Sequence, residues 1–320
     1  MEMVKTINEL YDSFIEYRKV CNLKHNDGIL KTFIAHANMS SSAPYLSHDI
    51  VAEWFTKRPS ENNNSYNVRI THVNAFLKYI NRFHNCDFKL GQLLDPVPIS
   101  EPIIPTSEEL KLFFDAVDEV EKQAIRIKSK LAIQMHQLKV IQAPVIFRLL
   151  KSSGMRPIEA RYLGVSDVDL NNGIIHIREG KGYRQRNIVL HPNMLKLLRQ
   201  YDVYVSEFIS EREAFFCDIS GGFRSKHWPS EWFNEFWESK NEPNRQVVVY
   251  CLRHLFVIDM INSWDSSDNL DLKFERLTRV LGHSSAATTI KYYYHLTEHN
   301  SIIINEEMND YFNRVVPNID

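Results

Sequence analysis

Four prolines fall within the eleven residues 95–105, and this segment constrains the fold more than any other feature of the chain. Proline fixes φ and lacks a backbone N–H, so the segment cannot continue a helix and should form an extended linker. It ends at Thr106, where a hydroxyl followed by two glutamates predicts a helix start. We therefore expect a helical domain over 1–95, a proline-rich linker over 96–105 and a larger domain over 106–320.

Apolar residues at helical spacing predict about four helices before the linker. These helices are expected over residues 7–20, 29–38, 47–57 and 66–83. The polar run 60–65 separates the last two and should be a loop.

Beyond the linker, the sequence predicts a long helix over 107–142, which Pro144 interrupts. Residues 173–178 alternate between apolar and polar side chains like a strand, and 186–190 form a second strand after a glycine-rich turn at 180–182. The rest of the chain looks helical. The expected fold class is therefore mainly α with a small β-sheet.

Several classes of protein are disfavoured by composition. No apolar run approaches 18 residues, and the start of the chain lacks the apolar core of a signal peptide. The four cysteines are scattered without C-x-x-C spacing, which argues against a zinc site and suits a reducing cytoplasm. No H-E-x-x-H, P-loop or G-x-G-x-x-G motif occurs. We expect a cytoplasmic protein with no membrane contact, no metal and no cofactor.

Charge is distributed unevenly along the chain. The net charge is −2, which alone does not suggest a nucleic-acid partner. Residues 151–200, however, hold nine Lys/Arg against four acids, and residues 298–320 hold one Arg against five acids. A local basic surface can bind phosphates although the whole chain is close to neutral.

Six side chains in the second domain suggest phosphoryl transfer to a tyrosine. Their types are what this chemistry needs, because cations and donors stabilise the charge that grows on phosphorus oxygens while a phenol oxygen attacks. In chain order they are Arg156, Lys181, Arg253, His254, His283 and one tyrosine of the run Tyr292-Tyr293-Tyr294.

Each of these side chains, taken alone, also fits a structural role. Arg156 could form a salt bridge with Glu159. Arg253 lies in an apolar stretch where a buried charge needs a partner, and Asp259 is an acid within reach along the chain. For the others, the structural roles are a solvated basic turn at Lys181, a helix cap at His283 and helix packing by the tyrosines.

The ordered set, with its spacing, resembles the tyrosine recombinases, or phage-type integrases, strongly over 103–300 and weakly over 1–95. The segments that carry the resemblance are G-x-R-x-x-E at 154–159, the G-K-G hairpin at 180–182, R-H at 253–254 and L-G-H at 281–283.

The resemblance implies a site-specific recombinase that joins DNA to a tyrosine as a 3′-phosphotyrosine. Arg156, Arg253 and His283 would hold the phosphate, with His254 as a supporting donor and base. Lys181 would protonate the leaving 5′ oxygen. The helical first domain and the mixed catalytic domain would grip opposite faces of double-stranded DNA, and a homotetramer would act on paired DNA sites without a divalent ion.

Two positions depart from the family pattern or leave it ambiguous. The family shows H-x-x-R-H, whereas Tyr250 stands in the first histidine's place; it can donate a hydrogen bond but cannot act as a base at neutral pH. The nucleophile is expected nine or ten residues after His283, which allows Tyr292 or Tyr293. We favour Tyr293, because only this residue gives Tyr-x-His with His295.

Two other functions stay open. A type IB topoisomerase shares the chemistry but relaxes DNA without exchanging partners. A decayed recombinase could persist as a non-catalytic DNA-binding regulator, and Tyr250 is the hint for it. The acidic tail carries an apolar stripe at Met308, Tyr311, Phe312 and Val315, which fits either local packing or, by the resemblance, a helix passed to a neighbouring protomer.

Overall fold

The structure of the chain is a computed structural model that divides into two compact units, Met1–Ser100 and Glu101–Asp320. The residues it describes are 5–23, 27–40, 44–98, 102–122, 129–178, 185–243, 246–264, 269–283 and 289–290. The division between the units falls inside the proline-rich segment.

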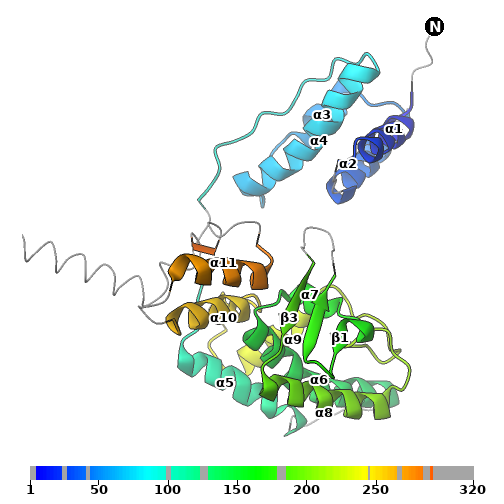
Figure 1. The fold of residues 1–320 in the computed structure, drawn as a ribbon. Coiled ribbons are helices and arrows are strands. Elements are labelled where there is room, and N and C mark those ends of the chain that lie inside the picture. The colour runs from blue at the N-terminus through cyan, green and yellow to red at the C-terminus, as the bar shows by residue number, and fades with distance from the viewer. Residues whose placement is uncertain are drawn as a thin grey trace, which may run out of the picture. The chain divides into compact units, whose positions relative to one another are not determined.

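The described residues of the first unit form four helices around an aromatic core (Figure 1). They are α1 (Ile7–Val20), α2 (Asp27–Ser40), α3 (His48–Trp54) and α4 (Asn63–Phe83). Phe76 of α4 meets the rings of Phe14 and Phe33 edge-on, at centroid distances of 5.5 and 6.4 Å. Helix α4 begins three residues earlier than predicted, because Asn62 in the polar run caps it by accepting from Ser65 N–H.

Asparagine side chains of α4 hold the extended segment 88–97 against that helix. Each of four asparagines donates its Nδ2 to a backbone carbonyl and accepts on Oδ1 from the N–H of the same residue, at 2.7–3.0 Å. The pairs are Asn81 with Phe88, Asn74 with Gly91, Asn67 with Leu94 and Asn64 with Val97. We call this arrangement the asparagine ladder.

The spacing of the ladder explains how a helix and an extended chain stay in step. Asn67, Asn74 and Asn81 are seven residues apart and their partners three residues apart, whereas Asn64 lies only three residues from Asn67. Seven helical residues rise about 10.5 Å and three extended residues about 10–11 Å, so these three rungs nearly coincide. Segment 88–97 therefore belongs to the first unit, although residues 96 and 97 fall within the linker that the sequence suggests.

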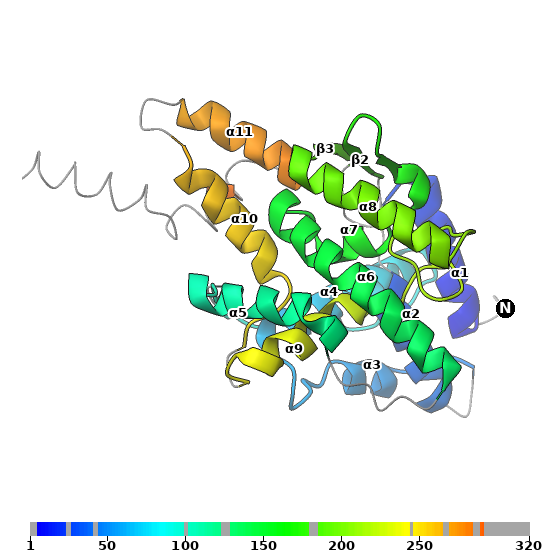
Figure 2. The same ribbon diagram turned by 90° about the horizontal axis from the view of Figure 1, so that it is seen from below.

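The second unit is mainly helical (Figure 2). Its helices are α5 (Ser107–Asp118), α6 (Lys130–Ser153), α7 (Pro157–Arg161), α8 (Pro192–Phe208), α9 (Trp228–Lys240), α10 (Cys251–Asn262) and α11 (Leu270–Leu281), with short 3-10 helices at Val120–Lys122 and Val165–Asp167. Helix α5 starts where predicted: Thr106 and Glu109 form a reciprocal capping box.

The single helix expected over 107–142 is wrong, because α5 ends at Asp118 and α6 begins at Lys130. Pro144 does not interrupt α6, which runs on to Ser153. An interior proline costs about 3 kcal/mol. Fully buried side chains such as Leu138 and Ile146 lie on both sides of it, and each contributes about 1.5–3 kcal/mol of burial. Packing therefore outweighs the loss of one helical hydrogen bond.

Three strands among the described residues form an antiparallel sheet in the order β1-β2-β3. The glycine-rich turn predicted at 180–182 falls between β2 and β3 in the sequence. The strands are β1 (Val168–Asp169), β2 (Ile174–Ile177) and β3 (Arg186–Val189). Sequence patterning predicts the last two; β1 is too short to show a period. Ile177 pairs with Arg186, so the pairing includes the last residue of β2 and the first residue of β3.

The sequence predicts that the chain after the second strand is helical, and this is wrong for the stretch between α8 and α9. That stretch carries isolated β-bridges from Ala214 to Gly164 and from Cys217 to Phe223.

Packing of the helices brings distant segments together. Helix α6 packs against both α8 and α10, and α11 lies beside β3 (Figure 2). Helices α10 and α11 share a small core around Ile261, Trp264 and Leu277. The C-terminal ends of α6 and α11 therefore lie close to the first turn of α10, the start of α7 and the start of β3. Among the described residues, no helix is long and apolar enough to cross a membrane.

Candidate active site

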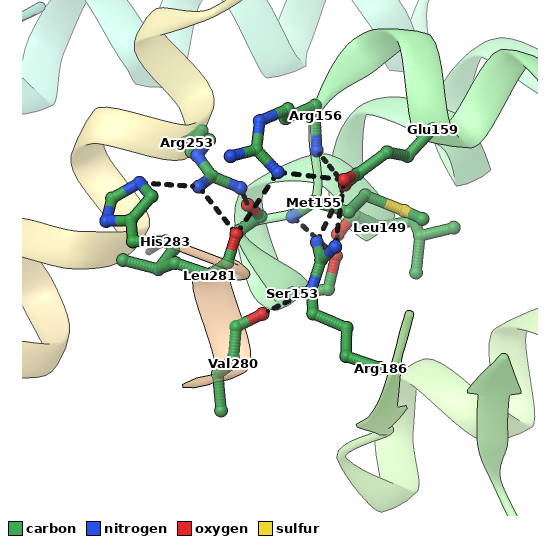
Figure 3. A network of polar contacts seen from close by, with 11 residues as sticks. Leu149, Ser153, Met155, Arg156, Glu159, Arg186, Arg253, Val280, Leu281 and His283 are labelled. Atoms are coloured by element: carbon green, nitrogen blue, oxygen red, sulfur yellow. Dashed lines mark hydrogen bonds and ion pairs between the residues drawn. The ribbon is translucent and has the colours of Figure 1, made fainter. Parts of the chain in front are cut away.

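A cluster of polar side chains lies where these elements meet (Figure 3). It unites three of the residues singled out in the sequence, Arg156, Arg253 and His283, although 127 positions of the sequence separate the first from the last. Glu159 and Arg186 complete the cluster.

Arg253 is the most buried member, with 1% of its surface exposed. Its Nη1 donates to Gly154 O at 2.6 Å and its Nη2 to Leu281 O at 2.9 Å. These carbonyls stand at the C-terminal ends of α6 and α11, where the negative ends of the helix dipoles stabilise a cation. The structural alternative of an ion pair with Asp259 is wrong, since Asp259 pairs with Lys151.

Arg156 lies at the start of α7 and shares an acceptor with Arg253. Its Nη1 donates to Glu159 Oε1 at 2.9 Å and to Leu281 O at 3.2 Å. The salt bridge with Glu159 considered above is therefore present, and it coexists with the clustering of the two arginines. One carbonyl thus fixes two guanidinium groups side by side, an arrangement suited to binding an anion.

Glu159 is held by two arginines rather than one. Arg186 Nη1 and Nη2 donate to its two carboxylate oxygens at 2.8 and 2.7 Å, and the backbone N–H of Arg156 donates at 2.7 Å. Burial alone would raise the pKa of Glu159, but hydrogen bonds and charge from Arg186 and Arg156 bring it below its ordinary value. The carboxylate is therefore ionised at neutral pH.

Arg186 is the residue of the cluster that sequence reasoning missed, since the hairpin offers several basic residues and nothing in the pattern singles it out. Its Nε also donates to Val280 O at 2.6 Å, near the end of α11. Its position as the first residue of the strand after the hairpin tip is the signal that could have identified it.

His283 has a defined tautomer. Its Nε2 lies 3.0 Å from Arg253 Nη2, and a guanidinium can only donate, so Nε2 is the acceptor. The ring proton is accordingly assigned to Nδ1, which lies 2.9 Å from Thr289 Oγ1. Burial, together with the charges of Arg253, Arg156 and Arg186, lowers the pKa of His283 to about 4. The ring is therefore neutral at pH 7.

His254, on the next position of α10, is neutral for the same reason. Burial and the charge of Arg253 lower its pKa to about 4. Its ring lies edge-on to Tyr250 at 5.1 Å, and Tyr250 also faces the guanidinium of Arg253 at 5.9 Å. A neutral imidazole can accept a proton, whereas Tyr250 contributes packing around both neighbours.

Lys181, Tyr292 and Tyr293 lie outside the described residues, so their expected roles stay predictions. In the sequence, described residues flank the segment that holds Lys181 and precede the segment that holds the tyrosines. Arg178 and the strand start at Arg186 flank the hairpin tip, and Thr289 precedes the tyrosine run. Within the described ranges, no group of three or more His, Cys, Asp or Glu side chains could hold a metal ion.

Comparison with known proteins gives a consistent result. The model of the phage integrase family matches residues 106–300. A probable integrase/recombinase protein of Methanocaldococcus jannaschii is 31% identical over 180 residues, covering 55% of this chain and 52% of that protein. The tyrosine recombinase XerC of Neisseria meningitidis is 26% identical over 144 residues, covering 45% and 44%. The matches thus span about half the length of these relatives.

A solved structure also shares the fold. The Tn1549 transposon integrase, solved in complex with transposon right end DNA, superposes with a TM-score of 0.59 over 95% of this chain and 100% of that chain. At 16% identity this likeness establishes the fold alone.

Proposed function

Because the chain belongs to the phage integrase family, that of the tyrosine recombinases, we propose that it is a site-specific DNA recombinase. It would cut and rejoin double-stranded DNA through a 3′-phosphotyrosine. The observation that carries this proposal is the cluster of Arg156, Arg253 and His283. Its two guanidinium groups are fixed as donors at helix ends, and the neutral imidazole accepts from one of them. Donors fixed in advance are effective because they need no reorganisation as charge develops.

The proposed reaction balances without a metal ion or an external energy source. The phenol oxygen of Tyr293 bonds to phosphorus, and the bond from phosphorus to the 5′ oxygen breaks. Lys181 gives its proton to that oxygen, while neutral His254 takes the phenol proton. The phosphotyrosine keeps the energy of the broken bond, so a 5′ hydroxyl can reverse the step on the same or another strand.

The domain roles and assembly are also proposals. Residues 1–95 would hold one face of the duplex, residues 96–105 would connect, and residues 106–320 would hold the other face and carry the chemistry. Four copies would act on paired DNA sites. The apolar stripe of the tail supports this assembly, although it lies outside the described residues.

Trapping the covalent intermediate tests the proposal. Nicked duplexes tiled across the DNA that flanks the gene lose the short leaving strand after cleavage, so an adduct accumulates and migrates as a band on a denaturing gel. Tyr293→Phe should abolish the adduct and leave DNA binding nearly unchanged, because only the phenol oxygen is lost. Tyr292→Phe is the matched control and should retain activity.

The same substrates separate the alternatives. If Tyr292→Phe is inactive and Tyr293→Phe is active, the nucleophile is the preceding tyrosine. A wild-type protein that binds DNA but never becomes attached is a regulator. Relaxation of a plasmid without a specific site indicates a topoisomerase.

A further inference from the structure

We propose that Arg186 is a positioning residue for strand cleavage. It fixes the hairpin, on which Lys181 lies, to the carboxylate of Glu159, and this carboxylate in turn holds Arg156. The inference rests on the proposed function and deepens it. Arg186 would act through Glu159 and the end of α11, without touching the DNA phosphate itself.

The place of Arg186 in the chain suits this role. It is the first residue of β3 and pairs with Ile177 across the base of the hairpin. Its side chain is 7% exposed and that of Glu159 is 2% exposed, so the ion pair between them is buried. Nη1 and Nη2 of Arg186 each donate to one carboxylate oxygen of Glu159, a planar fork that fixes orientation as well as distance.

The partners of Arg186 also hold the arginines of the cluster formed by Arg156, Glu159, Arg186, Arg253 and His283, which we call the phosphate cluster because it would bind the DNA phosphate. Glu159 also binds the backbone N–H and the Nη1 of Arg156. Val280, whose carbonyl accepts from Arg186 Nε, immediately precedes Leu281, whose carbonyl holds Arg156 and Arg253. A shift of β3 therefore moves the carboxylate and the helix end that place both arginines.

The opposite stem of the hairpin provides a matched comparison. Arg178 also forms an ion pair with a carboxylate, that of Asp167, and donates to Ser166 Oγ at 2.9 Å. Both partners lie on the 3-10 helix Val165–Asp167 and neither belongs to the cluster, and the side chain of Arg178 is 67% exposed. Arg178 can thus steady the hairpin but has no path to the arginines through these partners.

Single-turnover cleavage of the nicked duplex compares Arg186→Lys with Arg178→Lys. Lysine keeps the charge but loses the fork and the bond from Nε to Val280 O. We expect Arg186→Lys to cleave about 10- to 100-fold more slowly, since a misplacement near 1 Å costs on the order of 100-fold. Arg178→Lys should stay within about twofold of wild type. DNA affinity and thermal unfolding of both variants show that each is folded.

A 5′-bridging phosphorothiolate identifies which part of the site has moved. Its sulfur leaves without a proton, so it bypasses Lys181. The proposal predicts that Arg186→Lys stays slow on this substrate, because the phosphate cluster is displaced too. Glu159→Gln, which weakens the same contact from the other side, should give the same unrescued loss. The double variant should add little to either single change.

Three results would overturn the inference: a wild-type rate for Arg186→Lys, an equal loss in Arg178→Lys, or complete rescue by the phosphorothiolate. A wild-type protein that forms no adduct on any nicked duplex would instead overturn the proposed function, so the two failures are distinguishable.

Discussion

Replacing Gly282 by alanine should impair cleavage far more than it impairs folding. Gly282 ends α11 with a left-handed backbone, at φ +66°. It stands between Leu281, whose carbonyl holds both arginines, and His283, which accepts from one of them. Any adjustment of this residue is therefore passed directly to the phosphate cluster.

Two terms set the magnitude of the effect. A left-handed backbone costs an L-residue about 1–2 kcal/mol. An added Cβ would also lie 3.0 Å from Arg186 Nη1 and 3.3 Å from its Cδ and Cζ, and the guanidinium that must give way is fixed by Glu159. Together we expect about 1–3 kcal/mol, and thus a Tm lower by about 2–12 °C in a domain of this size. Cleavage should fall by about 10- to 100-fold.

Gly173→Ala is the matched control. Its φ is +71°, and an added Cβ would lie 3.0 Å from Leu195 Cδ2, the end of a flexible side chain. The backbone cost is therefore similar, but the turn between β1 and β2 holds no residue of the cluster.

Thermal unfolding by circular dichroism and single-turnover cleavage at 25 °C, well below both midpoints, measure the two effects separately. Gly173→Ala should lose stability and keep its cleavage rate within about twofold. If both variants lose cleavage in proportion to their stability, or if Gly282→Ala cleaves like wild type, the assigned role of the α11 end is refuted.

Further predictions concern individual groups and the tail. Lys181→Ala should cleave slowly and be rescued by the 5′-bridging phosphorothiolate; no rescue would exclude it as the acid. Arg253→Ala should lower single-turnover cleavage by about 100-fold or more, and a normal rate would remove it from the site. The pKa of His283, about 4, lies below its ordinary value of about 6.5, so the unfolded chain takes up the proton first. Stability should therefore fall from pH 6.5 towards pH 4 in urea titrations, and less steeply in His283→Asn. Deletion from Ser301 onward should leave a folded protein that binds one half-site but forms no synaptic complex; tetramers seen by light scattering with DNA would contradict this.

Three residues of the candidate site could be predicted from short sequence motifs. Arg156, Arg253 and His283 each stand in a short pattern that constrains their type, and the structure brings them together. The partners of Arg253 were not predictable, because main-chain carbonyls at helix ends leave no mark in the sequence. The pairing of Arg186 with Glu159 joins residues 27 positions apart, and only the tertiary fold selects it from several basic candidates.

Fold prediction failed where packing overrode local preference. Pro144 predicts a helix break, yet burial on both sides keeps α6 continuous. Strand β1 is two residues long and is a strand because its backbone pairs with β2. Two residues are too few to show an alternating pattern, so this strand could not be predicted from the sequence. The four asparagines of α4 are plain in the sequence, but polar side chains on a helix usually face water, and their backbone partners become visible only in the fold.

The asparagine ladder sets the length of the tether between the two units. With residues 88–97 fastened to α4, eight residues, 98–105, separate the ladder from Thr106, and they can span about 30 Å at most. Without the ladder the tether would be eighteen residues, 88–105, with about twice that reach. In the proposed function both domains hold one duplex, and a short tether would then keep the second domain at high effective concentration once the first has bound. Each rung that opened would release about three residues and lower that concentration, so under the proposed function the four asparagine side chains would set how strongly DNA binding by one domain favours binding by the other.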